Sequence, residues 1–358
     1  MPVPVNEQEA QNVLDRLIKA KLKPFVKKVD DEAYYAEDYL KAIGNSGLLH
    51  SRHTPLSRML PDESRLVEET AKTCMTTAFN LWCHLASLTY VRLSDNAYLH
   101  REILPLLENG EKLGGTGLSN PMKFFAGMEK LLLKAVRTTG GYIVSGQLGA
   151  VSNLGSGHWF GIIADAGDDR QIMAFVSCDV PGLALRKKAE FLGVNGSATY
   201  SCEFADVFIP DNWLLSEQAG DFVTKIRPAF VAYQIPLSLG ITKASIDGIK
   251  KFSDRQNGCN SYLRVQAAEI EDHYVSLREK FYQLLKSGEF AEQWEQLLKY
   301  RLDSAYLSLK AVQACMLHQG SAAYQKVSHA ARRLREAYFY ANLTPTIKHL
   351  EKMLCGHQ

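Results

Sequence analysis

A few residues in this chain have the types and spacing of catalytic or metal-binding groups. Most of them lack the further partner residues that catalysis or metal binding would need. Gly155-Ser156-Gly157-His158 places a serine next to a histidine, but such close neighbours rarely form a nucleophile–base pair, and no third orienting group is evident. We interpret this string as a turn. Cys83 adjoins His84, and Cys315 lies three residues before His318, but no second pair at zinc-like spacing accompanies them. The sequence therefore predicts no metal site.

The glycines do not form a recognisable nucleotide-binding loop. No G-x-G-x-x-G follows a predicted strand, and no G-x-x-x-x-G-K-[ST] is present. Residues 193–197 do not resemble a nucleophile elbow, because no strand leads into them and no helix follows. His84 lies in an apolar helical segment beside Trp82. A lone histidine there is more often a satisfied core residue, so it is only a weak catalytic candidate.

Composition describes a folded chain with a substantial core. Hydrophobic residues make up 46% and charged residues 22% of the 358 residues. The net charge of +2 gives no electrostatic case for nucleic acid or a membrane surface. Seven cysteines without a C-x-x-C pair suggest reduced thiols and a cytoplasmic location. We expect no secretory leader, because the first residues lack an apolar core, and no membrane span, because no apolar run of about 18 residues exists.

The spacing of apolar residues, which indicates the elements that position any site, changes twice along the chain. Short apolar runs bounded by Gly, Pro, Asn and Asp predict strands at 142–144, 160–164, 171–176 and 200–209. The chain before and after this stretch has helical spacing. We therefore predict an α+β fold. Its expected domains are an N-terminal helical domain (1–111), a middle β-barrel or β-sandwich domain (112–215) and a C-terminal four-helix bundle (216–358).

The helical parts contain one segment that is apolar on all sides and several that are amphipathic. Residues 76–90 predict a buried helix. Long helical patterns at 222–252, 262–286, 290–317 and 324–339 predict the bundle, with Pro236 as a kink or break in the first of them. Helix bundles of this kind are also common surfaces for oligomers.

Several local strings resemble those of the acyl-CoA dehydrogenase superfamily of flavoproteins, over nearly the whole chain. Residues 114–121 resemble a degraded T-E-P-x-A-G-S-D, with Ser119 for the threonine and Asn120 for the glutamate. Residues 141–153 match the spacing of G-x-x-x-x-G-x-K-x-W-I-T-N, with Ala150 and Ser152 at the tryptophan and threonine places.

The most specific part of the resemblance is the pair of strings that closes the middle domain. Residues 191–199 resemble K-x-L-G-x-R-x-S-x-T, and residues 206–215 resemble D-V-x-V-P-x-x-x-L-L. Later strings agree. Residues 254–258 resemble R-x-Q-F-G, with the arginine one place late and Asn257 in place of the aromatic residue. Residues 319–324 resemble the G-G-x-G-Y turn.

The resemblance implies FAD as cofactor and an oxidoreductase acting on CH–CH bonds. It implies that Leu118, Ser119 and Ser152 with Asn153 contact the flavin ring. It further implies that Arg255 reaches the FAD pyrophosphate of a neighbouring subunit, with Gln319 and Gly320 nearby. A homodimer or homotetramer and a small-molecule substrate, an acyl-CoA thioester being one candidate, follow from the same resemblance.

The chain departs from the family at the catalytic base. Family members remove the substrate α-proton with a glutamate in a Y-E-G-T string, or with one on the first C-terminal helix. Here the first place is occupied by Ala341 or Asn342 and the second by Ile226, so neither holds a carboxylate. Glu336 is near in sequence, but it takes the place of a structural acid that pairs with arginine.

Three functions remain open from the sequence. The first is an FAD-dependent oxidoreductase resembling acyl-CoA dehydrogenases, with an atypical or missing base. The second is a flavin-dependent monooxygenase on the same fold that receives reduced flavin from outside, with His84, Ser152 and Asn153 as polar groups at the reacting oxygen. The third is a member that has lost flavin and catalysis, which Ala150, Asn195 and the shifted Arg255 favour.

Overall fold

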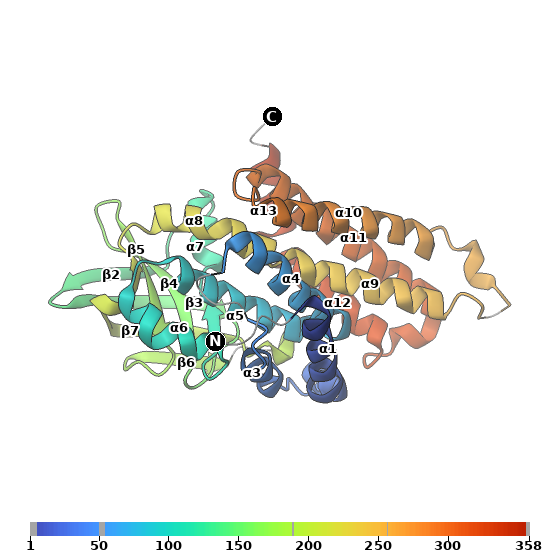
Figure 1. The fold of residues 1–358 in the computed structure, drawn as a ribbon, viewed down its shortest axis with the longest axis horizontal. Coiled ribbons are helices and arrows are strands. Elements are labelled where there is room, and N and C mark those ends of the chain that lie inside the picture. Colours follow the sequence, from blue (N-terminus) through green and yellow to red (C-terminus); the bar gives the residue numbers. More distant parts are fainter. Residues whose placement is uncertain (1–5, 50–53, 188–189, 256, 356–358) are drawn as a thin grey trace.

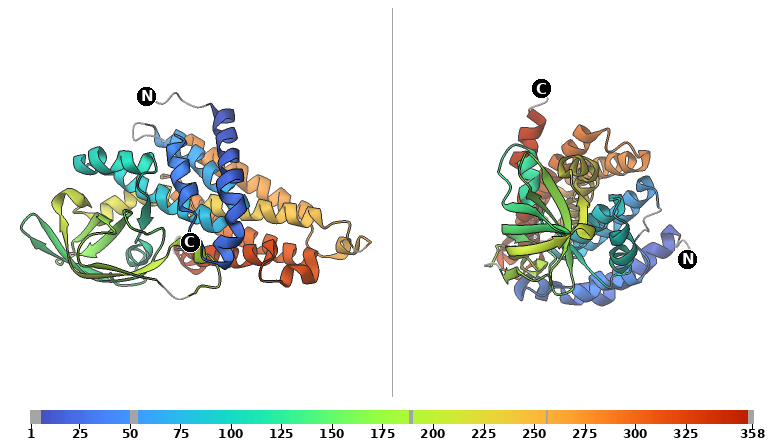
Figure 2. Two further views of the ribbon diagram at one scale, coloured as in Figure 1. Left: turned by 90° about the horizontal axis from the view of Figure 1, so that it is seen from below. Right: turned by 90° about the vertical axis from the view of Figure 1, so that its left-hand side faces the viewer.

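A mixed β-sheet occupies one end of the molecule and long helices occupy the other. The computed structural model describes residues 6–49, 54–187, 190–255 and 257–355. In Figure 1 the sheet lies to the left, and α9 to α12 extend to the right. The two views of Figure 2 show the N-terminal helices packed on one side of the line that joins the sheet to the C-terminal helices. The predicted α+β fold is confirmed.

The N-terminal helices lead up to one central, fully buried helix. A capping box begins the first of them, since the Asn6 side chain accepts from the backbone N–H of Glu9 and the Glu9 side chain accepts from that of Asn6. The helices of this part are α1 (Glu7–Leu17), α2 (Val26–Asp31), α3 (Glu37–Asn45), α4 (Leu56–Thr73), α5 (Met75–Leu93) and α6 (Leu104–Glu108).

Helix α5 is the predicted buried helix. Every residue from Met75 to Arg92 is buried, because α4, α8, α9 and strand β1 pack around it. A helix enclosed in this way has no face toward solvent, which agrees with its largely apolar sequence. Its buried polar side chains have partners inside the fold, for example Asn80 with Ser197 O and His84 with Leu107 O. It therefore positions side chains for both the helical and the sheet parts of the molecule.

Eight strands form one sheet within the described residues. They are β1 (Gly114–Thr116), β2 (Leu133–Thr138), β3 (Gly141–Val151), β4 (Trp159–Asp165), β5 (Gln171–Ser177), β6 (Leu183–Lys187), β7 (Tyr200–Pro210) and β8 (Leu214–Ser216). Their order is β6-β7-β3-β2-β4-β5-β8, and β1 pairs with β4. The β1–β4 and β2–β4 pairs are parallel and the others antiparallel.

The four predicted strands are confirmed as β3, β4, β5 and β7. Sequence reasoning missed β1, β2, β6 and β8. β1 and β8 have only three residues each, β2 is mostly exposed, and β6 has no fully buried residue. The inner face of the sheet has its own apolar core, in which Val144, Phe160 and Val207 are fully buried. One short helix, α7 (Ser119–Phe125), interrupts this region between β1 and β2.

The C-terminal helices form the long part of the molecule. They are α8 (Ala219–Ala232), α9 (Ile235–Lys251), α10 (Ala267–Ser287), α11 (Trp294–Gln319), α12 (His329–Asn342) and α13 (Ile347–Cys355). The break expected at Pro236 is present, since α8 ends at Ala232 and the proline lies in the first turn of α9. In the part of the chain that the structure describes, no helix is both long and apolar enough to cross a membrane.

Candidate functional site

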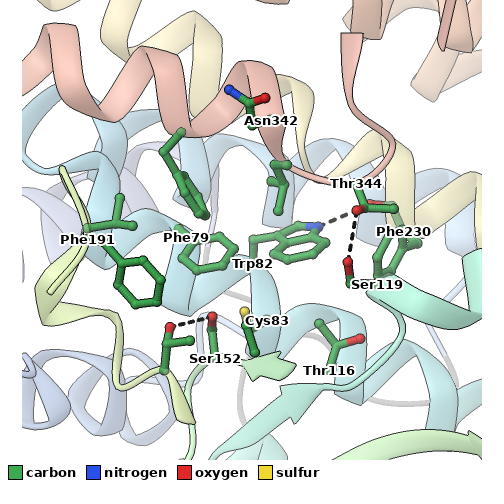
Figure 3. Close-up of a pocket in the computed structure, with 15 residues that line it drawn as sticks. Phe79, Trp82, Cys83, Thr116, Ser119, Ser152, Phe191, Phe230, Asn342 and Thr344 are labelled. Carbon is green, nitrogen blue, oxygen red and sulfur yellow. Dashed lines mark hydrogen bonds between the residues drawn. The ribbon is translucent and has the colours of Figure 1, made fainter. Parts of the chain in front are cut away.

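One pocket lies where the sheet, α5 and the end of α12 meet, and we call it the central pocket. It encloses about 210 Å³. Figure 3 shows Phe79, Trp82 and Cys83 of α5 in its middle, Ser152 on the sheet side and Asn342 with Thr344 on the side of α12. The lining consists of Phe79, Trp82, Cys83, Thr116, Ser119, Ala150, Ser152, Phe191, Val194, Thr199, Phe230, Phe339, Asn342, Leu343 and Thr344.

Four aromatic rings form a continuous wall of the central pocket. Phe79 stacks on Trp82 with 5.5 Å between ring centroids, and Phe339 meets Phe79 edge-on at 4.7 Å. Phe230 meets the Trp82 ring edge-on at 4.9 Å, and its carbonyl oxygen accepts a hydrogen bond of 3.1 Å from the Trp82 indole N–H. Such edge-on and stacked pairs fix ring orientation, so this wall is preformed and suits a flat, apolar ligand face.

Two pairs of hydroxyl groups line the edges of the same pocket. Ser119 Oγ lies 2.9 Å from Thr344 Oγ1, and Ser152 Oγ lies 2.7 Å from Thr199 Oγ1. Each hydroxyl has one donor and two acceptor positions, so a pair that shares one hydrogen bond still has capacity for a ligand. Ser119 and Ser152, predicted from sequence to lie together, are therefore brought to one pocket.

No carboxylate, histidine, lysine or arginine is among the described residues that line the central pocket. Burial raises the pKa of the Cys83 thiol well above its ordinary value, so this group stays neutral. Asn342 occupies the lining, whereas Ala341 does not, which places the asparagine where the expected base would face a substrate. Ile226 is fully buried and outside the lining.

Glu336 serves the fold. Its carboxylate accepts from Arg332 Nη1 at 2.7 Å and from the backbone N–H and hydroxyl of Thr76 at 3.0 and 2.9 Å. The side chain is 1% exposed and is not part of the pocket lining. It is the arginine-paired acid that the sequence suggested.

The structure places His84 and Asn153 outside the pocket lining, which corrects their assignment as groups facing a reacting oxygen. The N–H of Gly114 donates to His84 Nδ1 at 3.0 Å, so Nε2 carries the proton and donates to Leu107 O at 3.1 Å. Burial lowers the pKa of His84 to about 3, which keeps the ring neutral. Asn153 is fully buried, accepting from the Tyr35 hydroxyl and donating to Gly114 O.

Of the remaining predicted residues, Leu118 adjoins the pocket residue Ser119 in sequence, and the others lie at the far end of the bundle. Leu118 directly precedes α7, and its side chain is fully buried. Arg255 belongs to the segment between α9 and α10. That segment lies at the right-hand end of Figure 1, away from the sheet. Asn260 joins this loop to the end of α11, because its amide donates to Phe252 O and His318 O. Gln319 and Gly320 follow there, whereas Gln256 lies outside the described residues.

Sequence reasoning missed the aromatic wall and Thr344. Phe79 and Trp82 are three apart on α5, which places them on one helix face, but Phe230 and Phe339 come from distant helices. The string 155–158 was interpreted correctly, since it forms a turn closed by a hydrogen bond from His158 N–H to Gly155 O.

Two curated relatives match about two thirds of the chain at low identity. Benzylmalonyl-CoA dehydrogenase of Aromatoleum aromaticum is 22% identical over 66% of this chain and 62% of its own length. The mitochondrial isobutyryl-CoA dehydrogenase of Dictyostelium discoideum is 24% identical over 61% of this chain and 54% of its own length. The matches therefore span less than two thirds of these relatives. No protein-family model matches the chain.

Solved structures match the whole fold. Butyryl-CoA dehydrogenase of Megasphaera elsdenii superposes with a TM-score of 0.86 at 16% identity and covers 100% of this chain and 99% of its own. KijD3, solved in complex with FMN and dTDP-3-amino-2,3,6-trideoxy-4-keto-3-methyl-D-glucose, superposes with a TM-score of 0.78 at 19% identity and covers 100% and 94%.

Fold and sequence matches agree on one class. The chain belongs to the acyl-CoA dehydrogenase superfamily. Within that class it is a divergent member, since the relatives are no more than 24% identical over the matched residues.

Proposed function

We propose that this chain is an FAD-dependent oxidoreductase of the acyl-CoA dehydrogenase type that lacks the usual α-proton base. The observation that carries the proposal is the central pocket itself. Its aromatic wall, its two hydroxyl pairs and its lack of lining carboxylates among the described residues combine a site for a flat ring with no proton acceptor for a substrate carbon.

The lining fits a flavin ring by its chemistry. A ring of this kind needs hydrogen-bond donors at its polar edge and apolar contact at its faces. Ser119 and Ser152 supply hydroxyl donors from opposite sides of the pocket, and Trp82 and Phe79 supply apolar faces. Leu118 would contribute through its backbone N–H. A bound flavin supplies the ring that accepts a hydride or electrons from the substrate.

The residues around the pocket hold the lining segments in place and keep water out. None of the described lining residues supplies a group that would take a proton at neutral pH. Asn342 donates its amide to Tyr338 O at 2.8 Å, which leaves its side-chain oxygen to accept a hydrogen bond but not a proton at neutral pH. Arg301, fully buried, donates to Tyr340 O and Leu343 O, and Gln234 donates to Thr344 O. These bonds hold the 340–344 segment against the pocket.

The same proposal assigns roles beyond the pocket. We propose that the stretches 1–111, 112–215 and 216–358 act as three domains, and that the chain forms a homodimer or homotetramer. The loop after α9, which contains Arg255, lies at the end of the bundle opposite the sheet (Figure 1), so we assign Arg255 to the FAD pyrophosphate of the adjoining subunit, with Gln319 and Gly320 beside it. An acyl-CoA thioester is the first substrate class to test. The seven cysteines form no disulfide, which suits a cytoplasmic location.

A spectrum tests this function. The purified full chain should absorb between about 350 and 500 nm, or should gain bound FAD absorbance on titration, because the ring pocket is preformed. A colourless protein that does not bind added FAD or FMN would instead identify a member that has lost flavin.

A second function is favoured by one observation, the absence of ionisable groups from the described pocket lining other than the neutral Cys83. A flavin-dependent monooxygenase supplied with reduced flavin from outside needs no α-proton base. Oxygen consumption with NADH and an added flavin reductase, dependent on this chain and on substrate, would select it. Anaerobic bleaching of the bound flavin by an acyl-CoA would select the dehydrogenase.

A further inference from the structure

A second cavity adjoins the central pocket, and we call it the Arg227 pocket. It encloses about 270 Å³ between α7, α8, α11 and α13. The two cavities share Phe230. Pro345, which lines the Arg227 pocket, directly follows Thr344, which lines the central pocket. A molecule long enough to pass Phe230 would therefore occupy both.

The charge of the Arg227 pocket differs from that of its neighbour. Arg227 and Lys352 line it together with His349, while no carboxylate is among its described lining residues. Neither Arg227 nor Lys352 forms an ion pair with any carboxylate that the structure describes. The rest of the lining is apolar, with Phe125 and Trp294 among its members. The cavity thus combines apolar walls with uncompensated positive charge.

Arg227 is held by a ring and not by an acid. Its guanidinium lies 4.8 Å from the centre of the Trp294 ring, where the ring face attracts a cation. Half-burial lowers its pKa, and no carboxylate counteracts that effect. Stacking on an aromatic face leaves the N–H edge of a guanidinium able to bind an oxyanion with two parallel hydrogen bonds.

His349 is the second sign of a missing ligand. The residue is 3% exposed, yet neither ring nitrogen has a hydrogen-bond partner. Buried polar atoms are nearly always paired, so an imidazole with both nitrogens unpaired calls for an explanation. Burial, with Lys123 and Lys352 nearby, lowers its pKa. An anion placed between Arg227 and His349 would pair both groups and offset the charge of Lys352.

We propose that the Arg227 pocket binds the oxyanion group of a two-part substrate whose apolar body reacts in the central pocket. This inference rests on the proposed function for the identity of the reacting site. The anion is a carboxylate or a phosphate, because both match the donors present. Selection for charge in one cavity and for apolar surface in the next defines the substrate class as an apolar or aromatic compound that carries one anionic end.

Small probes test this proposal without any turnover. The full chain is titrated with phenylacetate, phenyl phosphate and the neutral analogue phenylacetamide, and binding is followed by calorimetry and by tryptophan fluorescence, to which Trp294 contributes. We expect one or both anions to bind at least about tenfold more tightly than phenylacetamide. The preferred anion identifies carboxylate or phosphate as the natural group.

Variants connect the binding to the named residues. Arg227→Gln should weaken anion binding about tenfold to a hundredfold and leave phenylacetamide binding unchanged. Lys352→Gln, at an exposed position, should weaken anion binding a few fold. The matched control is Arg170→Gln, because Arg170 lies in the exposed turn between β4 and β5 and should leave both affinities unchanged.

Equal affinity for phenylacetate, phenyl phosphate and phenylacetamide would overturn the proposal, as would anion binding that survives both Arg227→Gln and Lys352→Gln. The readout separates this inference from the proposed function. A chain that prefers anions but binds no flavin keeps the anion pocket and loses the flavin assignment. A chain that binds FAD but shows no preference for anions keeps the flavin assignment and loses the anion pocket.

Discussion

The helical interior and the central pocket differ sharply in their use of carboxylates. Among the described residues, three glutamates are buried in the helical part, and each accepts hydrogen bonds from at least two side chains. Glu68 accepts from the hydroxyls of Tyr274 and Tyr282 and from Arg278, and Glu63 accepts from Arg92 and Tyr233. Glu336 accepts from Arg332 and Thr76. The central pocket, a short distance away along α5 and α12, has no acid among its described lining residues.

In the part of the chain that the structure describes, the buried carboxylates connect helices to one another. None of them lies in the central pocket, where it could accept a proton from a substrate. The carboxylate oxygens of these three glutamates already accept hydrogen bonds from side chains of the fold. A base must face a substrate with a free oxygen, and Asn342 stands where such a group would face the pocket. The two regions are therefore chemically distinct although they share helices.

The largest expected effect comes from placing an acid in the pocket. If FAD binds, Asn342→Glu should increase anaerobic flavin bleaching by a saturated acyl-CoA about 10²–10⁴-fold over the wild type, since a positioned general base contributes about that much. Stopped-flow absorbance near 450 nm measures the rate. Ala341→Glu is the matched control, because Ala341 is buried outside the lining and should gain less. Rapid bleaching by the wild type would instead mean that this chain has a base elsewhere.

Removing an acid from the helical interior should cost stability. Glu336→Gln leaves Arg332 buried without its counter-charge, so the free energy of unfolding should fall by about 3–5 kcal/mol. Urea denaturation followed by circular dichroism measures the change. For comparison, Glu203→Gln removes an exposed pair with Arg186 and should cost about 1 kcal/mol or less. Equal losses in the two variants would contradict the contrast between buried and exposed acids.

The next largest effect is expected on FAD affinity, from the positive charge of Arg255 outside the central pocket. Arg255→Ala should weaken FAD binding by about 1.5–3 kcal/mol, the contribution of a hydrogen bond to a charged group. Equilibrium titration with FAD measures the affinity, with Arg170→Ala as a remote control. Retention of FAD at wild-type affinity would show that the pyrophosphate is bound by other residues.

The smallest effect tests the neutral donors of the pocket. Ser152→Ala removes one hydroxyl from the pair with Thr199, while Thr199 keeps its hydrogen bond to Ser197. FAD affinity should fall by about 0.5–1.5 kcal/mol, as for a neutral hydrogen bond. Ser201→Ala, at a half-buried serine that accepts from Gln147 and is not among the described residues lining the central pocket, provides the control and should leave affinity unchanged. A loss as large as that of Arg255→Ala would argue that Ser152 does more than donate one neutral bond.

Local patterns predicted the elements better than the site. Strands β4 and β5 and the helix α5 were evident because they are buried along nearly their whole length. Strand β7 was evident because its buried and exposed positions alternate, and β3 because turn residues precede its apolar start. Ser119 and Ser152 were placed together through the resemblance. The aromatic wall was not predicted, since Phe79, Phe230 and Phe339 meet only after three helices pack.

Polar residues inside a core were the hardest to assign from sequence. His84 and Asn153 have side chains that suit catalysis, but hydrogen bonds from Gly114 and Tyr35 occupy them in the fold. Nothing in the local sequence distinguishes a polar group that binds its own backbone from one that faces a cavity. The charged lining of the Arg227 pocket was invisible for a related reason, because Arg227 and His349 lie on different helices.

Phe230 lies between the central pocket and the Arg227 pocket, so its position bears on the length of any ligand that would occupy both. Its ring is pinned against Trp82, and its carbonyl oxygen accepts the Trp82 indole N–H, so the partition between the cavities is fixed to the wall of one of them. A compound that is too short reaches one side of this partition and leaves the cationic side empty. A compound that is too long has its apolar body displaced from the hydroxyl pairs. If the Arg227 pocket binds an anion as proposed, the spacing set by this one phenylalanine would select among molecules that carry the same functional groups.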